Sequence, residues 1–213
     1  MPTFARSLLA VLLLLASLLV AAQQRAPDAL VKDVTEEVLT ILREDKQIRS
    51  GDSRRAAELI ETRIAPHFDF PRMTALAVGR RWTQANEEQR RQLSEEFRTL
   101  LVRTYANALT EYRDETVTFK PMRKGPDAKE ALVQSQINKP GGQPVNLDYR
   151  LVDKGGEWKV IDVTVAGVSL VTNYRSSFNN EISSGGIEGL LKALQEKNRN
   201  PQAPVPTAAG GTS

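Results

Sequence analysis

Apolar residues recur at spacings of three and four along the first half of the chain, with charged residues between them. This pattern is typical of α-helices that bury one face and leave the other in water. It predicts helices over 28–49, 53–64 and 70–78. Asp52 and Asp69 stand where the N-caps of the second and third of these helices are expected.

The most regular apolar stripe follows Asn86, where we expect a long helix to begin. Gln89 completes a capping-box pattern with Asn86, in which each side chain accepts a hydrogen bond from the other residue's backbone N–H. The stripe consists of Leu93, Phe97, Leu101, Tyr105, Leu109 and Tyr112. We interpret the charged residues between these positions as a solvated face.

Past the long helix, apolar residues alternate with polar ones, which predicts β-strands. The strand candidates cover 115–121, 129–138, 145–152 and 157–165. In the last strand, the alternation places Ile161, Val163 and Val165 on one face. Trp158 and Val160 are expected on the other face. Short connections that contain Gly or Pro separate the strands and favour antiparallel pairing.

Two further helices are expected after the strands. Ser169 is the candidate N-cap of the first, and the segment Ser183–Gly186 separates it from the second. Helices, then a sheet, then helices again are typical of an α+β domain and not of an alternating parallel fold. We therefore expect an α+β fold in which a four-stranded antiparallel sheet packs with several helices.

The first residues of the chain have the pattern of a secretory leader. Arg6 precedes an unbroken apolar run over 8–20, and the small residues that follow end at Ala22. This arrangement predicts export and a cleavable signal peptide over 1–22. A membrane anchor is the alternative, but the run is shorter than the about 20 apolar residues that span a bilayer.

The rest of the chain is expected to form one domain over 23–198 and a disordered tail over 199–213, where Pro, Ala, Gly and Thr dominate. The whole chain holds 29 basic and 26 acidic residues and no cysteine. Such balanced charge argues against a nucleic-acid partner, because phosphate binding needs a dense basic surface. Without cysteine, the exported protein has no disulfide and no cysteine to carry a lipid anchor.

The sequence offers little material for catalysis or metal binding. His67 is the only histidine, and with no cysteine present we expect no metal site. The best enzymatic candidate is an acid–tyrosine pair on the sheet, Asp162 with Tyr149, but Asp162 is expected on the face opposite Ile161 and Val163. We therefore predict a protein that is not an enzyme and has no cofactor.

What remains is more apolar surface than one closed core requires. One face of the sheet and the stripe of the long helix are both apolar. They either pack against each other as ordinary core or stand apart and line a cavity. Periodicity does not separate these alternatives, because both produce the same pattern.

Several long motifs resemble one protein family. The motifs are HFDFPRMT at 67–74, LAVGRRW at 76–82, VNLDYR at 145–150, GEWKVIDV at 156–163 and GVSLVTNYR at 167–175. In this order they resemble the MlaC family, also called the toluene-tolerance or phospholipid-transport substrate-binding family. The resemblance covers roughly 28–197, and one departure is Asn86-Glu87 where the family is expected to have Thr-Pro.

The resemblance implies a periplasmic phospholipid carrier of double-membrane bacteria. Its fold would be a curved sheet in an NTF2-like arrangement that encloses, with helices, an apolar cavity for acyl chains. Its partners would be an outer-membrane lipoprotein–porin complex and an inner-membrane ABC transporter complex with a substrate-binding ring, and its role would be to maintain outer-membrane lipid asymmetry. A small periplasmic α+β enzyme and a periplasmic chaperone or adaptor are the alternatives.

For such a carrier, we predict which side chains line the lipid cavity, although ordinary core is the alternative for each. The predicted lipid-binding residues are Met73, Leu76, Phe97, Leu101, Tyr105, Leu109, Tyr149, Ile161, Val163, Val165, Val168 and Val171. Arg80, Arg81 and Arg175 are candidates for contact with head-group phosphates or with acidic partners, and surface solvation is their alternative role.

Overall fold

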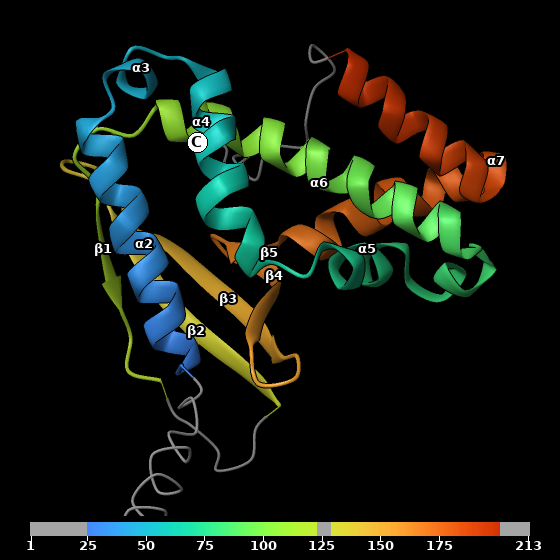
Figure 1. Cartoon of the computed structure of the whole chain (residues 1–213), viewed down its shortest axis with the longest axis horizontal. Helices are drawn as coiled ribbons and strands as arrows, with labels where there is room; N and C mark the ends of the chain where they lie inside the picture. The colour runs from blue at the N-terminus through green and yellow to red at the C-terminus, as the bar shows by residue number, and fades with distance from the viewer. Residues whose placement is uncertain (1–24, 123–128, 201–213) are drawn as a thin grey trace, which may run out of the picture.

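The computed structural model describes residues 25–122 and 129–200, and it confirms the α+β class (Figure 1). The helices are α2 (Pro27–Glu44), α3 (Lys46–Arg49), α4 (Ser53–Leu59), α5 (Phe70–Val78), α6 (Glu87–Thr110) and α7 (Leu170–Arg199). The strands are β1 (Thr116–Phe119), β2 (Glu130–Asn138), β3 (Val145–Asp153), β4 (Trp158–Val165) and β5 (Val168–Ser169). The predicted signal peptide and nearly all of the predicted tail lie outside the described ranges.

The helix predicted over 28–49 is interrupted at Asp45. The backbone of Asp45 is extended, and its carboxylate accepts hydrogen bonds from the N–H groups of Gln47 at 2.9 Å and Ile48 at 3.1 Å. An aspartate that caps the helix following it ends the helix preceding it, because a cap residue does not have helical dihedral angles. The prediction of one helix was therefore wrong at this residue, and α2 ends at Glu44.

The second predicted helix has the expected extent but changes type along its length. α4 gives way to a π-helical turn over Ile60–Ile64, which is followed by a 3₁₀ turn over Ala65–His67. Pro66 lies in the 3₁₀ turn and has no N–H group with which to continue the α-helical ladder. Single π-turns inside helices are frequent near functional sites.

The caps expected for α5 and α6 are confirmed. The Asp69 carboxylate accepts a hydrogen bond from the N–H of Arg72 at 3.1 Å. At the start of α6, Asn86 and Gln89 each accept the other's backbone N–H at 2.9 Å, which forms a complete capping box. These bonds satisfy N–H groups that have no partner within the helix.

The sheet is antiparallel throughout and has the order β1-β2-β3-β4-β5, with five strands where four were expected. The additional strand pairs Val168 with Val165 across a two-residue turn. Ala166 and Gly167 form this turn, and both have positive φ angles, 50° and 84°. Positive φ at both central residues suits the twist of a tight hairpin. A strand of two residues is too short to show alternation in the sequence.

A β-bulge in β4 overturns the predicted faces of this strand. Asp162 pairs with Arg150, but Val160 already pairs with Leu151, so Ile161 is an extra residue with no counterpart on β3. One extra residue inverts the alternation on its far side. Val160 and Val163 consequently belong to the same hydrophobic cluster, although the alternation had placed them on opposite faces.

The two helices predicted after the sheet are joined into α7, which is interrupted at one residue. Gly186 has φ 66° and ψ −162°, far from helical values. The predicted break over Ser183–Gly186 is thus present as a kink within a continuous helical segment. The predicted cap is confirmed, since the Ser169 hydroxyl accepts the N–H of Thr172 at 3.1 Å.

The buried apolar residues form three clusters. The helical cluster joins α5, α6 and α7, where the ring of Phe97 meets the rings of Tyr174 and Phe178 edge-on at 5.0 and 5.1 Å. The upper cluster joins the C-terminal half of α2 to α3, α4 and α6, through residues such as Leu42. The sheet cluster joins the N-terminal half of α2 to the sheet, through residues such as Leu30. Helix α2 is thus shared by two clusters and lies over the sheet, while α5–α7 extend to one side (Figure 1).

Replacing Asn86 with alanine removes the capping box and should lower the free energy of unfolding by about 1 kcal/mol. Urea denaturation measures this change. The matched control is Asn107→Ala, at an exposed position inside the same helix. Since Asn107 caps nothing, this change should not destabilise the protein. Equal losses in the two variants would contradict the assigned role of the cap.

Candidate functional site

A cavity of about 560 Å³ lies between α2 and the face of the sheet that α2 covers. Helix α2 contributes Leu30, Val31, Val34, Thr35, Val38, Leu39 and Leu42. The sheet contributes Val117, Ile137, Val145, Leu147, Tyr149 and Val160. The remaining lining residues are Ile64, His67, Phe68, Ala108, Leu109, Glu111, Tyr112, Glu115, Lys139 and Gln143. The volume is ordinary for a ligand site, for which roughly 300–1,000 Å³ is typical.

The sheet supplies its lining residues because they share one face. Ile137 on β2 pairs with Val145 on β3 and with Val117 on β1. Leu147 and Tyr149 follow Val145 at intervals of two along β3. Since side chains alternate along a strand, all of these point to the same side of the sheet. The alternating pattern of the third predicted strand therefore forms one wall of the cavity.

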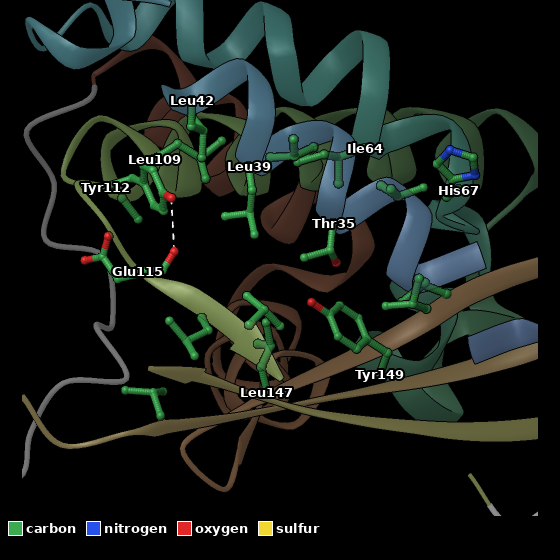
Figure 2. A pocket seen from close by; sticks show the side chains of 18 of the residues that line it. Thr35, Leu39, Leu42, Ile64, His67, Leu109, Tyr112, Glu115, Leu147 and Tyr149 are labelled. Atoms are coloured by element: carbon green, nitrogen blue, oxygen red, sulfur yellow. Dashed lines mark hydrogen bonds between the residues drawn. The ribbon is translucent and has the colours of Figure 1, made fainter. Parts of the chain in front are cut away.

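Helix α2 is buried near its two ends against two different clusters, and Val34 between them packs partly against both. At its start, Leu30 and Val31 are buried with Val133 and Leu151 of the sheet. Toward its other end, Val38 and Leu42 are buried with residues of α4 and α6 in the upper cluster. A helix held by two separate clusters spans the space between them. The side chains in its middle, such as Leu39, face the cavity (Figure 2).

A hydrogen-bonded tyrosine lines one end of the cavity. The Tyr112 hydroxyl donates to the backbone carbonyl of Glu115 at 3.0 Å (Figure 2) and accepts a bond from Arg43 Nε at 3.2 Å. This connects the end of α2 to the segment that follows α6. Lys139 also lines this end and is exposed, so the rim carries charges of both signs.

A second hollow of about 330 Å³ lies between α2 and the edge strand β1. It shares Thr35, Leu39 and Val117 with the main cavity, so these residues stand at the junction of the two spaces. Lys32 and Glu36 line only the second hollow, and their charged groups lie 3.8 Å apart. The chemistry therefore changes from apolar to polar across this junction.

Burial disfavours the charged forms of two groups in the cavity wall, Tyr149 and His67. It raises the pKa of Tyr149 to about 12, and the nearby hydroxyls of Thr35 and Ser135 offset only part of this rise. It also lowers the pKa of His67, with a further contribution from the positive charge of Lys159. Both effects follow because a low-dielectric environment disfavours a charged form. The deep part of the cavity can therefore offer hydrogen bonds but no charge.

The structure places the predicted lipid-binding residues in several environments. Leu109 and Tyr149 line the cavity. Four of the predicted residues belong to the helical cluster, Met73, Phe97, Leu101 and Val171, and Leu76 packs against this cluster. Val163 belongs to the sheet cluster and Val165 packs against it, while Tyr105 packs against all three clusters. Ile161 is buried at the bulge, and Val168 is 40% exposed. The set as a whole stays a prediction, with only Leu109 and Tyr149 at this cavity.

None of the predicted lipid-binding residues lies on α2, so the prediction missed a helix that contributes seven of the residues lining the cavity. A usable signal was the width of its apolar surface. The stripe through Leu30, Val34 and Val38 is flanked by Val31 and Leu39, which is broader than contact with a single partner requires. A broad apolar surface on a helix indicates contact with two separate surfaces or with a ligand.

The candidate acid–tyrosine pair is not brought together in the cavity. Tyr149 faces the cavity, whereas the Asp162 carboxylate accepts hydrogen bonds from Ser169 Oγ at 2.7 Å and from the N–H of Val171 at 3.2 Å. Asp162 therefore helps to hold the start of α7. Over residues 25–122 and 129–200, no group of three or more His, Cys, Asp or Glu residues is arranged to hold a metal ion. Within the same residues, no helix is both long and apolar enough to cross a bilayer.

The arginines considered for head-group contact bind the protein itself where hydrogen bonds are seen. Arg175 donates from Nε and from a terminal nitrogen to the backbone carbonyl of Leu76, at 3.2 and 2.8 Å. Arg81 donates to the Ser183 hydroxyl at 3.4 Å. These bonds join α7 to α5 and to the turn that follows α5.

Comparisons with known proteins agree on one family. The family model described as MlaC protein matches residues 32–196. The chain is 28% identical to the toluene tolerance protein ttg2D of Pseudomonas putida, over 94% of this chain and 97% of that protein. It is 21% identical to the intermembrane phospholipid transport system binding protein MlaC of Haemophilus influenzae, over 85% of this chain and 86% of that protein. A phospholipid-binding protein from Ralstonia solanacearum, solved in complex with a phospholipid, superposes with a TM-score of 0.77 at 38% identity, covering 82% of this chain and 98% of that one.

The raised pKa of Tyr149 predicts a loss of stability at high pH. The ordinary pKa is 10.0 and the pKa in the folded protein is about 12, so the unfolded chain releases this proton first. The unfolding free energy should therefore fall as pH rises between these two values. The unfolding free energy of Tyr149→Phe, measured by urea denaturation, should fall less steeply with pH across this range. Below pH 10 its dependence on pH should match that of the wild type. Identical slopes above pH 10 would show that Tyr149 is not the responsible group.

Proposed function

Because the chain belongs to the MlaC protein family, we propose that it is a phospholipid carrier that holds acyl chains in the cavity between α2 and the sheet. The observation that carries the proposal is the cavity itself, about 560 Å³ in volume and lined mainly by aliphatic side chains. The phospholipid complex of the 38% identical relative supports the same type of ligand.

The energetics explain why a carrier needs such a cavity. Keeping one methylene out of water is worth about 0.8 kcal/mol, so a lipid with roughly 30 methylenes faces a cost on the order of 20 kcal/mol in water. Aliphatic walls formed by α2 and β3 remove most of this cost for the part of the lipid that they cover. No covalent step is required, and we propose that the protein is not an enzyme.

Loading from a membrane is close to neutral in free energy, because the lipid leaves one apolar environment for another. The carrier itself therefore does not determine direction. In this proposal, the relative affinities of its docking partners and ATP use elsewhere do so. The proposed partners are an outer-membrane lipoprotein–porin complex and an inner-membrane ABC transporter complex with a substrate-binding ring, and exchange between them would maintain outer-membrane lipid asymmetry.

This role requires export to the periplasm. The proposed leader over 1–22 would supply it, and the proposed lipid-binding domain would then cover 23–198. The family match begins at residue 32, after the leader, which is consistent with this division.

Filling the cavity should prevent lipid binding. Ile137→Trp places a large ring in the space that acyl chains would occupy, so the purified variant should carry at least several-fold less phospholipid than the wild type. The matched control is Leu132→Trp on the same strand, because Leu132 is 53% exposed and does not line the cavity. Organic extraction followed by mass spectrometry measures the lipid for each protein, and circular dichroism checks folding.

Two results would contradict the proposal. The first is a wild-type protein that carries no phospholipid after purification from a double-membrane bacterium and takes none up from vesicles. The second is a folded Ile137→Trp variant that retains the wild-type amount of lipid.

A further inference from the structure

Two hydroxyl groups face each other inside the otherwise aliphatic part of the cavity. Tyr149 projects from β3, and Thr35 projects toward it from α2 (Figure 2). Thr35 is close enough to oppose part of the rise in the pKa of Tyr149. Ser135 acts on the pKa of Tyr149 in the same way, so both hydroxyls lie within reach of the Tyr149 hydroxyl. The neighbouring hydroxyl of Ser135 is already donated to the carbonyl of Leu147 at 2.9 Å.

Such an arrangement provides polar partners for a ligand inside an apolar cavity. A hydroxyl group carries one donor and two acceptor positions, so each of the two can form a hydrogen bond with a ligand that enters. Since the pKa of Tyr149 is about 12, its hydroxyl keeps its proton and remains a donor at neutral pH. Because burial also lowers the pKa of His67, this part of the wall offers no cation at neutral pH. A neutral acceptor therefore fits these hydroxyls better than a phosphate or a carboxylate does.

The position of the pair narrows the choice of acceptor. Thr35 stands at the junction between the main cavity and the second hollow, which opens between α2 and β1. On one side of the junction the walls are aliphatic, and on the other Lys32 and Glu36 present charges of both signs. The groups of a phospholipid follow the same sequence, from hydrocarbon chains through ester carbonyls to a charged head group. The ester carbonyls would therefore lie at the junction.

We propose that Tyr149, assisted by Thr35, hydrogen-bonds an ester carbonyl of the bound lipid and thereby sets how deeply the lipid enters. Acyl chains occupy the main cavity, and the head group lies toward the gap between α2 and β1. Tyr149 is then a specificity-determining residue that favours ester-linked lipids over lipids without carbonyls. This inference rests on the proposed phospholipid-carrier function.

A pair of matched lipids tests the contact. One is a phosphatidylcholine with two ester-linked chains, and the other has the same head group and chain lengths but two ether links, so it lacks both carbonyls. Native mass spectrometry of the delipidated mature protein measures competition between them. The wild type should prefer the diester by about 3- to 10-fold, which is the range expected for one hydrogen bond. Tyr149→Phe should bind the two lipids about equally while its affinity for the diether stays unchanged.

Control variants separate this contact from an effect on folding. Tyr174→Phe removes a tyrosine hydroxyl from the helical cluster, away from the cavity, and should keep the preference. Thr35→Val should reduce the preference, whereas Thr35→Ser, which keeps the hydroxyl, should restore it. The two Thr35 variants keep the test available if Tyr149→Phe does not fold.

The outcomes are distinct. If the wild type binds diester and diether equally, or if folded Tyr149→Phe keeps the preference, the ester contact is wrong and the carrier function stands. If the wild type binds neither lipid, the carrier function itself fails.

Discussion

The cavity depends on how one helix is anchored. Helix α2 is buried at its start against the sheet, through Leu30 and Val31, and toward its end against α4 and α6, through Val38 and Leu42. Each anchor buries large aliphatic side chains, and each such side chain contributes about 1.5–3 kcal/mol. If α2 moved to close the space above the sheet, the upper cluster would lose its contacts with Val38 and Leu42. The two anchors thus hold the apolar walls apart, which is what a lipid carrier requires.

Polar contacts fix the end of α2 more than they stabilise the fold. Asp45 ends the helix because it caps α3. The Arg55 guanidinium lies 2.9 Å from the Asp45 carboxylate. The hydrogen bond between them is the main cause of the lowered pKa of Asp45. Arg43 and Tyr112 join the same end of α2 to the segment beyond α6. Exposed ion pairs contribute roughly 0–1 kcal/mol each, so these contacts set position, while the aliphatic anchors supply most of the energy.

Local patterns predicted the elements well, because caps and periodicity act over a few residues. The capping box at Asn86 and the caps Asp69 and Ser169 lie where the sequence placed them. The errors have physical causes that periodicity does not report. Ile161 is an extra residue only relative to β3, where it has no counterpart, so the sequence of β4 alone does not reveal the bulge. The position of the cavity depends on which helix packs against which face of the sheet, and periodicity within one element does not report this. The stripe of α6 near Phe97 packs in the helical cluster, whereas α2 lines the cavity.

The most direct test of the account asks which residues the acyl chains touch. A phospholipid with a photoactivatable diazirine in one chain can be loaded into the wild-type protein, cross-linked by light and mapped by peptide mass spectrometry. The account predicts cross-links on α2 (Pro27–Glu44) and β3 (Val145–Asp153), at cavity residues such as Leu39 and Leu147. Cross-links concentrated in the helical cluster, at residues such as Phe97, with α2 unlabelled, would contradict it.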